Sequence, residues 1–585
     1  MKRSEVAEQY KWDLSSYYKN EAEFERDFAK AQGFVEKFNK LPHALNKENA
    51  LDALKLESEA GLLIGRLYVY SHLVKDENTS KTESLTRMQR MQMLYVQILQ
   101  ASSFIEPVLA KLSDAELTEI LNDPRYENFS RQIYGLIRSK KHILSEEQEG
   151  IMSAISAFTH DFQEVFTMLD NADMKFGKIK IDGVTTDLTH GKYSLILQNP
   201  DRKLRAKAFK QYYKSFHSHI NTIAATYVGN VKKNCTIAKI RGYKSALESA
   251  LFNEEITDTV YKNNIESVAS GFEAMHKYVA YRAKKLGLER AEFYDMYIPL
   301  IKDADIQLEY EDAVSLVKEA LKPLGNEYLT ALSSLFTERH VDVFETENKR
   351  SGAYQSGTYG CPPVVLLNYE KTTHDVFTIA HEAGHAMHTH FSNAAQCYEK
   401  SEYVIFIAEI ASTVNEVLLL KHLLKTATGE TREYLLSYYI DMFRTTIFRQ
   451  TMFSEFEAFA HGSYEKGKAL TAESFSKFYL SLNKKYYGKS AVHGKDIAAE
   501  WARIPHFYNA FYVYKYSTGL TSAVNIANKI LADPAYVEKY LKFLSLGGSL
   551  PTLDILRTAD VDLETKDPFE FAMREFSAAM DELFK

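Results

Sequence analysis

The run TIAHEAGHAMH contains two histidines and a glutamate whose spacing suits metal chemistry. His381 and His385 are four residues apart, so on a helix both imidazoles project from one face and can hold one Zn²⁺. Glu382 would then lie near the open coordination position, where a carboxylate can take a proton from bound water. Two half-buried core histidines would show the same spacing, so the neighbouring sequence has to decide between these interpretations.

A third ligand must come from another segment. His388 and Phe391 stand where the metzincin pattern requires Gly and His, which excludes that pattern. Glu409 lies in the apolar run EYVIFIAEIASTVNEVLLL, where a carboxylate is unfavourable unless it is paired, hydrogen-bonded or metal-bound. Glu416 follows on the same helical face and could accept the second N–H of a metal-bound histidine. The alternatives are that Glu409 pairs with a lysine and that Glu416 is solvated.

A helix over the segment 372–391 must present the two histidines. Thr372 followed by Asp375 predicts a capping box at its N-terminus, and Asp375 also suits the positive end of the helix dipole. Gly384 lowers helix stability by about 1 kcal/mol relative to alanine. We interpret this glycine as a sign that another element packs closely against the helix beside the metal.

Strand signals are confined to two places. The segment 174–188 alternates apolar and polar residues around an Asp-Gly pair and predicts a hairpin. The segment 351–369 has two β-prone runs split by a Gly-Cys-Pro-Pro stretch. A sheet edge there could hold a peptide backbone by main-chain hydrogen bonds, and we assign Gly352 and Ala353 to substrate binding. A hairpin packed beneath the metal helix is an equally good interpretation.

The segment IPHFYNAFYVYKYSTG carries a group of aromatic residues. Tyr508, Tyr512 and Tyr516 recur every four residues, which predicts one helical stripe. Such stripes are usually part of a core, yet amide hydrolysis passes through an oxyanion that needs placed hydrogen-bond donors. We assign that role to His506 and Tyr512, and substrate binding to Tyr516. Tyr516 could also replace Tyr512 as the donor.

Composition restricts the class of protein. Hydrophobic residues make up 45% and charged residues 25% of 585 residues, as in an ordinary globular protein. The net charge of −7 argues against a nucleic-acid partner. The first residues lack the apolar core of a signal peptide, and no uninterrupted apolar run approaches membrane-spanning length. Three widely spaced cysteines suggest free thiols, so we expect a cytoplasmic protein without a membrane partner.

The chain is too long for one typical core, and most of it shows helical periodicity, as in 85–112 and 258–288. The sequence therefore predicts a mainly α fold with a small β-sheet close in sequence to the metal helix. We place an N-terminal helical domain over 1–200, including the hairpin, and a catalytic domain over 201–585.

These motifs closely resemble the oligoendopeptidase F branch of the thimet-oligopeptidase-like zinc metallopeptidases. The similarity covers most of the chain. Besides HEAGHAMHTHF and IFIAEIASTVNE, it includes four blocks, at 12–18, 171–209, 350–369 and 504–519.

The resemblance implies that His381, His385 and Glu409 bind one zinc ion per chain and that Glu382 is the catalytic base. It further implies a two-lobed, multi-helix fold with a deep central channel that admits short unfolded peptides, which are cleaved at internal bonds. A zinc carboxypeptidase or dipeptidase on a similar helical fold is the nearer alternative. A non-catalytic peptide-binding protein is the more distant one, because every ligand position and the base are present.

Overall fold

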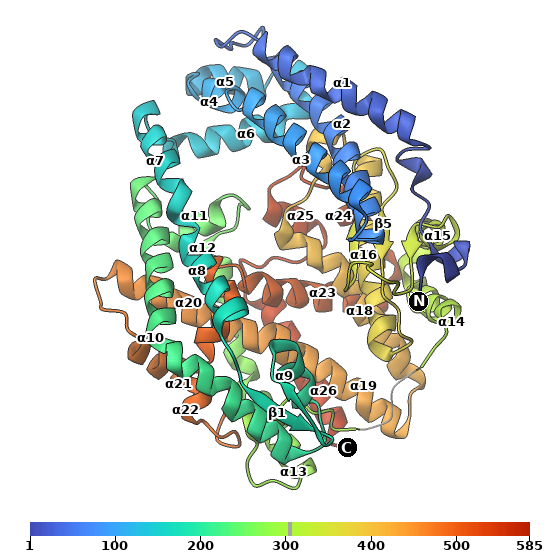
Figure 1. The fold of residues 1–585 in the computed structure, drawn as a ribbon, viewed down its shortest axis with the longest axis vertical. Helices are drawn as coiled ribbons and strands as arrows, with labels where there is room; N and C mark the ends of the chain where they lie inside the picture. The colour runs from blue at the N-terminus through green and yellow to red at the C-terminus, as the bar shows by residue number, and fades with distance from the viewer. Residues whose placement is uncertain (302–306) are drawn as a thin grey trace. The chain divides into compact units, whose positions relative to one another are not determined.

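Helices dominate because apolar residues recur at helical spacing and because Pro and Gly are sparse, at 12 and 25 of 585 residues. The computed structural model describes residues 1–301 and 307–585 (Figure 1). In it, 72% of residues are helical and 3% lie in strands. The expected mainly α fold with a small sheet is confirmed.

The chain forms two compact units, each assembled from separated segments. Unit 1 comprises Met1–Lys141, Asp305–Leu423 and Ile526–Val561. Unit 2 comprises His142–Ala304, Leu424–Asn525 and Asp562–Lys585. The domain boundary expected near residue 200 does not coincide with these units, because segments far apart in sequence contribute to the same core.

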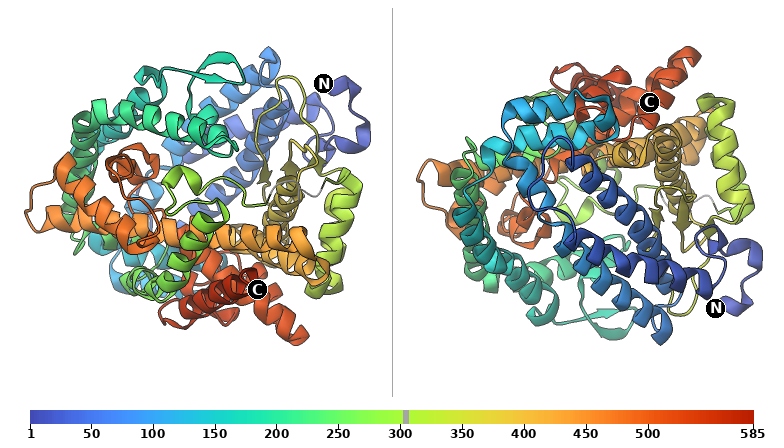
Figure 2. Two further views of the ribbon diagram at one scale, coloured as in Figure 1. Left: turned by 90° about the horizontal axis from the view of Figure 1, so that it is seen from below. Right: turned by 90° about the horizontal axis from the view of Figure 1, so that it is seen from above.

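Unit 1 contains the long N-terminal helices, which pack against one another and appear side by side in blue in Figure 2. Its helices are α1 (Glu21–Asn39), α2 (Ala50–Glu77), α3 (Thr82–Ser102), α4 (Ile105–Ala110), α5 (Asp114–Leu121), α6 (Ser130–Ser139), α14 (Tyr310–Ala320), α15 (Gly325–Thr337), α16 (Thr373–Ala395), α17 (Tyr398–Ser401), α18 (Ile405–Thr426, which ends just beyond the unit boundary), α24 (Val537–Ser545) and α25 (Thr552–Thr558).

The sheet of unit 1 has the strand order β3-β5-β4. Strand β5 (Val364–Leu366) is central and fully buried. It pairs in parallel with β3 (Val341–Asp342) and antiparallel with β4 (Tyr354–Ser356). The two β-prone runs expected in 351–369 therefore form β4 and β5. Both strands pack on α16, so the sheet supports the helix that carries the two histidines.

Unit 2 is built around the 39-residue helix α10, which contacts α8, α9, α11, α20 and α21. Its helices are α7 (Glu146–Thr159), α8 (Asp161–Met168), α9 (His190–Leu197), α10 (Arg202–Ile240), α11 (Ala246–Phe252), α12 (Asp258–Val268), α13 (Phe272–Lys285), α19 (Gly429–Met442), α20 (Arg449–Glu465), α21 (Ala472–Tyr487), α22 (Lys495–Ala498), α23 (Tyr514–Ala532, which begins in this unit) and α26 (Asp567–Leu583).

The hairpin expected in 174–188 is present and belongs to unit 2, not to an N-terminal domain over 1–200. Strands β1 (Lys178–Ile181) and β2 (Val184–Asp187) pair in antiparallel register. Asp182 and Gly183 join them with φ angles of 48° and 87°. A two-residue hairpin turn that matches the strand twist requires positive φ at both central residues, so the turn predicted at Asp182 and Gly183 is confirmed.

Each long helix expected from periodicity is interrupted. The segment 85–112 divides into α3 and α4, and 258–288 divides into α12 and α13 around a 3₁₀ turn at Ala269–Gly271. A Cβ on Gly271 would lie 2.5 Å from Met573 Sδ and 2.8 Å from Phe448 Cζ. Close packing there explains a break that periodicity alone does not reveal.

One stretch of the described chain, 82–110, is long and apolar enough to cross a membrane by length and composition. Length and composition do not distinguish a membrane span from a helix packed on its neighbours. In the structure the stretch consists of α3 and α4, and α3 packs along both α1 and α2.

Candidate metal and catalytic site

Helix α16 presents the H-E-x-x-H residues from a firmly anchored position. The expected capping box is present at its start: Thr372 Oγ1 accepts the Asp375 N–H at 3.2 Å, and the Asp375 carboxylate accepts the Thr372 N–H at 2.9 Å. One face of the helix is buried against α14, α15, α24 and the sheet. The opposite side of the same segment carries the half-buried His381 and His385.

Helix α18 crosses α16 closely, and a glycine permits this. A Cβ on Gly384 would lie 2.5 Å from Ser412 Cα and 2.6 Å from the Ala411 carbonyl oxygen. Asn415 also ties the helices together, since its Nδ2 donates to the Ala380 carbonyl oxygen at 3.0 Å. The partner inferred for Gly384 is therefore the backbone of α18.

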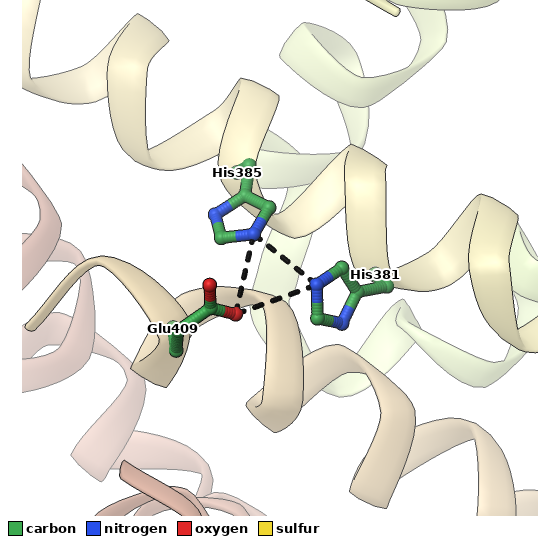
Figure 3. Close-up of side chains that lie close together, drawn as sticks. All are labelled: His381, His385 and Glu409. Atoms are coloured by element: carbon green, nitrogen blue, oxygen red, sulfur yellow. Dashed lines mark hydrogen bonds and ion pairs between the residues drawn. The ribbon is translucent and has the colours of Figure 1, made fainter. Parts of the chain in front are cut away.

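Three side-chain atoms from these two helices converge on one point (Figure 3). His381 Nε2 and His385 Nε2 are 3.2 Å apart, and Glu409 Oε2 lies 3.4 Å and 3.5 Å from them, respectively. Tetrahedral zinc with bonds of roughly 2.0 Å requires ligand atoms about 3.3 Å apart. The three distances between the ligand atoms, which form the edges of a triangle, fit that requirement. Within the part of the chain that the structure describes, this is the one group of three His, Cys, Asp or Glu side chains found close enough to share an ion.

Glu416 orients His381. Its carboxylate accepts a hydrogen bond from His381 Nδ1, which leaves Nε2 facing Glu409 and His385. Burial opposes a charge on His381, but the hydrogen bonds to Glu409 and Glu416 outweigh it and raise the His381 pKa to about 10. The same histidine hydrogen bonds lower the Glu409 pKa. The structure thus places Glu416 where a partner for a ligand histidine should lie.

Glu409 is more accessible than its sequence suggests. The residues flanking it in α18 are largely buried, yet its own side chain is 39% exposed. The carboxylate therefore opens toward the histidines and solvent instead of entering the core. Its nearest charged neighbours are these histidines, and the structure brings no lysine to it among the ion pairs of the described residues.

Glu382 lies beside this group but is much less accessible, at 7% exposure. Burial raises the pKa of its carboxyl, whereas His381 and His385 lower it and Glu409 raises it further. Its carboxylate accepts the backbone N–H of Gln355 in strand β4. This contact links the proposed base directly to the sheet edge.

Strand β4 has its outer edge free of strand partners among the described residues. Val365 donates its N–H to His340, on the β3 side of the sheet. In an antiparallel pair, two directly opposed residues either both point their backbone groups toward each other or both point them away. Val365 points its backbone groups away from its partner Gln355, so Gln355 also directs its backbone groups away, toward the outer edge of β4. Gly352 and Ala353 lead into this edge, and Asn368 Nδ2 fixes the Gly352 carbonyl oxygen at 2.7 Å.

A cavity of about 790 Å³ in unit 1 continues from this edge. Gly357 and Tyr359 line it directly after β4, and Thr389 lines it one helical turn beyond His385. Tyr403 lies opposite, with its hydroxyl 3.1 Å from Thr389 Oγ1. The hollow is therefore lined by the segment that directly follows β4 and by the part of α16 beyond His385.

The aromatic segment of unit 2 differs from the expected single helix. Tyr508 ends the 3₁₀ helix η12 (Pro505–Tyr508), Tyr512 lies in an irregular segment, and α23 begins only at Tyr514. The prediction of one helical stripe is therefore wrong. Tyr508 is a core residue: its hydroxyl lies 2.8 Å from Thr226 Oγ1, and its ring stacks on Phe166.

His506, Tyr512 and Tyr516 nevertheless come together. Their ring centroids are 5.5–6.3 Å apart in all three pairs. His506 is exposed and the two tyrosines are half-buried, so the cluster is accessible. These residues belong to unit 2, whereas the metal-ligand group belongs to unit 1. Their shared role stays a prediction.

Sequence reasoning missed two residues that support the site. Gln355 acts through its backbone, which no side-chain pattern can reveal. Asn415, a buried polar residue in an apolar helix, could have been found by the same argument that selected Glu409, because a buried amide needs partners. Its Oδ1 accepts the Tyr328 hydroxyl at 2.9 Å.

Fold and site together define the class of mainly helical metallopeptidases in which two histidines of H-E-x-x-H and a later glutamate form the ligand set. Residues 195–575 match the family described as Peptidase family M3, and residues 109–176 match that described as Oligopeptidase F. The chain belongs to peptidase family M3, whose members are metal-dependent.

Curated relatives are similar along the whole chain. Oligopeptidase PepF from Bacillus subtilis is 35% identical, with 99% of this chain and 88% of the relative covered. An oligoendopeptidase F homolog from Lactococcus lactis is 34% identical, with 100% and 98% covered.

Solved structures are also similar to this chain. A putative peptidase from Chlamydophila abortus has a TM-score of 0.91 at 32% identity, covering 100% of this chain and 99% of that one. Oligoendopeptidase-F from Enterococcus faecium has a TM-score of 0.75 at 31% identity, covering 96% and 98%. The protein is thus a metalloendopeptidase, and the oligoendopeptidase F resemblance is confirmed.

Proposed function

We propose that the protein hydrolyses internal peptide bonds of oligopeptides with one zinc ion per chain, held by His381, His385 and Glu409. The observation that carries the proposal is the triangle of ligand atoms with edges of 3.2, 3.4 and 3.5 Å, the size that tetrahedral zinc requires. Two imidazoles and one carboxylate are also a ligand set that leaves a position open for water. The names of the relatives, oligopeptidase and oligoendopeptidase, support the substrate class.

Glu382 is the base in this proposal. Zinc bound at the site would acidify a water molecule and polarise the scissile carbonyl group. The Glu382 carboxylate takes the water proton and later delivers it to the departing amine nitrogen. Burial supports this role, because a raised carboxyl pKa brings the base nearer to the working pH.

The outer edge of β4 binds the substrate backbone. Gln355 directs its carbonyl group outward, where it can accept an N–H of an extended peptide, while its own N–H holds Glu382. Main-chain pairing of this kind is independent of side chains, which suits an enzyme acting on varied peptides. Gly352 and Ala353 extend the same edge.

His506 and Tyr512 supply hydrogen-bond donors to the oxyanion that forms during amide hydrolysis, with Tyr516 contacting the substrate beside them. Burial lowers the pKa of His506 and so favours its neutral form, which can donate through one ring N–H. The proximity of the three rings supports their action as one group.

Peptide cleavage with and without chelator tests the zinc and the reaction class. A quenched peptide blocked at both ends should be cut internally, and product masses should show fragments instead of single residues or dipeptides from an end. Chelation should abolish cleavage, and stoichiometric zinc should restore it. Release of terminal residues only, from unblocked peptides, would favour the carboxypeptidase or dipeptidase alternative.

Glu382→Gln tests the base separately. This variant should retain zinc and bind peptide but lose hydrolysis by at least about 10³-fold, because the amide cannot accept the water proton. Glu430→Gln, at an exposed position in the first turn of α19, is a matched control that should behave as the wild type. Wild-type turnover by Glu382→Gln would disprove the assignment.

We also propose a cytoplasmic location. All three cysteines are free thiols, and burial raises the pKa of Cys235 and of Cys361, which keeps both unreactive. Free thiols of this kind are typical of a reducing compartment. Fractionation of the source cells should recover the peptidase activity with cytoplasmic marker enzymes, and recovery in the extracellular fraction would contradict the proposal.

A further inference from the structure

A carboxyl group lies buried in unit 2, and it forms no ion pair among the residues that the structure describes. Glu457, in the middle of α20, has a fully buried side chain at 0% exposure. Its Oε1 accepts the backbone N–H of Phe511 at 2.9 Å, and Oε2 has no hydrogen-bond partner in the described structure. Burial raises the Glu457 pKa well above its usual range. Burying a carboxyl group is unfavourable. The presence of one at this place, bonded to the Phe511 backbone, therefore needs an explanation.

Phe511 has a backbone conformation that bulky residues rarely adopt. Its φ angle is +56°, in the left-handed region, and its side chain is buried. The ring contacts His461 at a centroid distance of 4.5 Å and Tyr261 at 5.7 Å. A strained conformation persists only where its surroundings hold it, and the Glu457 carboxyl holds the N–H of the strained residue itself.

The turn at Phe511 directs Tyr512 toward His506. It lies between η12, which contains His506, and α23, which contains Tyr516. The chain direction set by Phe511 therefore decides where the Tyr512 ring points, and that ring lies 6.3 Å from His506 and 5.5 Å from Tyr516.

The remaining contacts of the Tyr512 ring reinforce its position without fixing the turn. Lys515 Nζ lies 5.1 Å from the Tyr512 ring centroid, and Lys515 is itself held by Glu254 at 2.7 Å. Lys515 follows the turn in sequence, so its place beside Tyr512 depends on where α23 begins. By contrast, Phe511, the left-handed residue of the turn itself, donates its N–H to Glu457.

We infer that Glu457 is a positioning residue, which acts through the Phe511 backbone to hold Tyr512 beside His506. The inference rests on the proposed function, in which these two side chains serve the oxyanion. A neutral carboxyl suffices for this task, because only one oxygen has to accept an N–H. The task therefore requires an acceptor oxygen on a side chain of the right length, and it does not require a charge.

Substitutions that keep or remove the acceptor test this. Glu457→Leu should lower kcat about tenfold or more with little change in KM or zinc content, because Tyr512 loses its placement while the metal site is untouched. Glu457→Gln retains an amide oxygen at the same reach and should restore kcat to within about threefold of the wild type. Equal losses in the Gln and Leu variants would overturn the inference.

A control is needed because Glu457→Leu also leaves the buried Phe511 N–H unpaired and so destabilises unit 2. Tyr278→Phe removes two other hydrogen bonds of unit 2: a part-buried one from the Tyr278 hydroxyl to Asp441 Oδ1 at 3.0 Å, and a buried one that this hydroxyl accepts from Arg282 at 3.1 Å. This variant should lower the melting temperature but retain wild-type kcat. A matching loss of kcat in Tyr278→Phe would show that stability alone explains the effect and would refute the positioning role.

A double-mutant cycle separates positioning from general damage. If Glu457 acts through Tyr512, adding Glu457→Leu to Tyr512→Phe should cause almost no further loss of kcat. An equal fold-loss of kcat from Glu457→Leu in the wild-type protein and in Tyr512→Phe would overturn the inference. A Tyr512→Phe variant with wild-type kcat would overturn it as well. Failure of the zinc and Glu382 proposal is recognised independently, by the chelator and Glu382→Gln results, which do not involve this turn.

Discussion

Replacing Gly384 with alanine tests how closely the ligand positions depend on the contact between α16 and α18. Intrinsic helix propensity predicts that this change stabilises α16 by about 1 kcal/mol. The structure predicts the opposite sign. The new Cβ would lie 2.5 Å from Ser412 Cα, 2.6 Å from the Ala411 carbonyl oxygen and 2.8 Å from the Ser412 nitrogen, and all three are backbone atoms that cannot rotate away.

The size of the effect follows from these distances. Carbon atoms pack at roughly 3.5–4.0 Å, so the helices have to separate by about 1 Å. Glu409 lies one turn before Ser412 and would move with it, whereas both histidines stay on α16. The two Glu409 edges, now 3.4 and 3.5 Å, would then exceed what bonds of about 2.0 Å to one ion allow. We expect zinc affinity to fall by about 10²-fold.

Zinc content after dialysis against a graded chelator series measures this affinity, and the melting temperature of the zinc-free protein reports the helix contact separately. Gly135→Ala is the matched control, because Gly135 lies in helix α6 of the same unit with nothing within 4 Å of its Cβ position. The control should retain zinc and gain slightly in stability. Wild-type zinc affinity together with an unchanged melting temperature in Gly384→Ala would refute the reasoning.

Three further predictions follow from the site. Glu416→Gln keeps an acceptor for His381 but loses the charge, so zinc affinity in a chelator competition should fall about tenfold, and no change would contradict an orienting role. Gln355→Pro removes the N–H that holds Glu382, so kcat/KM on the quenched peptide should fall about tenfold, and wild-type kcat/KM would remove this contact from the mechanism. Burial lowers the His388 pKa to about 3, so the folded protein resists protonation of this histidine. The stability that His388 contributes above pH 6.5 is therefore lost as the pH falls, by about 1.4 kcal/mol per pH unit. Urea unfolding of zinc-free protein should therefore lose about 2 kcal/mol from this residue between pH 7 and 5, and His388→Phe should flatten that dependence; equal slopes would contradict it.

The sequence predicted the parts of the site that local rules control. A spacing of four residues puts His381 and His385 on one helical face wherever the helix lies, and the capping box at Thr372 depends on contacts only three residues apart. Glu416 could be selected because it lies seven residues after Glu409. The proximity of α18 to α16 was signalled by Gly384.

The sequence could not predict features that distant residues impose. The turn before Tyr512 depends on a left-handed Phe511, which is held by a carboxyl group 54 residues earlier in the chain. The Gln355 contact depends on strand register, and residue types do not specify which backbone groups face outward. The interleaved units depend on contacts between segments hundreds of residues apart, so a single boundary near residue 200 could not describe them.

The hydrogen bonds of His381 also determine how the apoprotein can acquire its metal. Flanked by Glu409 and Glu416, this imidazole keeps a proton at neutral pH, as its pKa of about 10 indicates. The proton on His381 of α16 thus faces the two carboxylates of α18, and this attraction favours contact between the helices before a metal ion arrives. Metal uptake becomes an exchange, in which the incoming ion displaces a proton from a site that is already shaped. Protons therefore compete with zinc for this site, and acidity in the surroundings opposes metal binding.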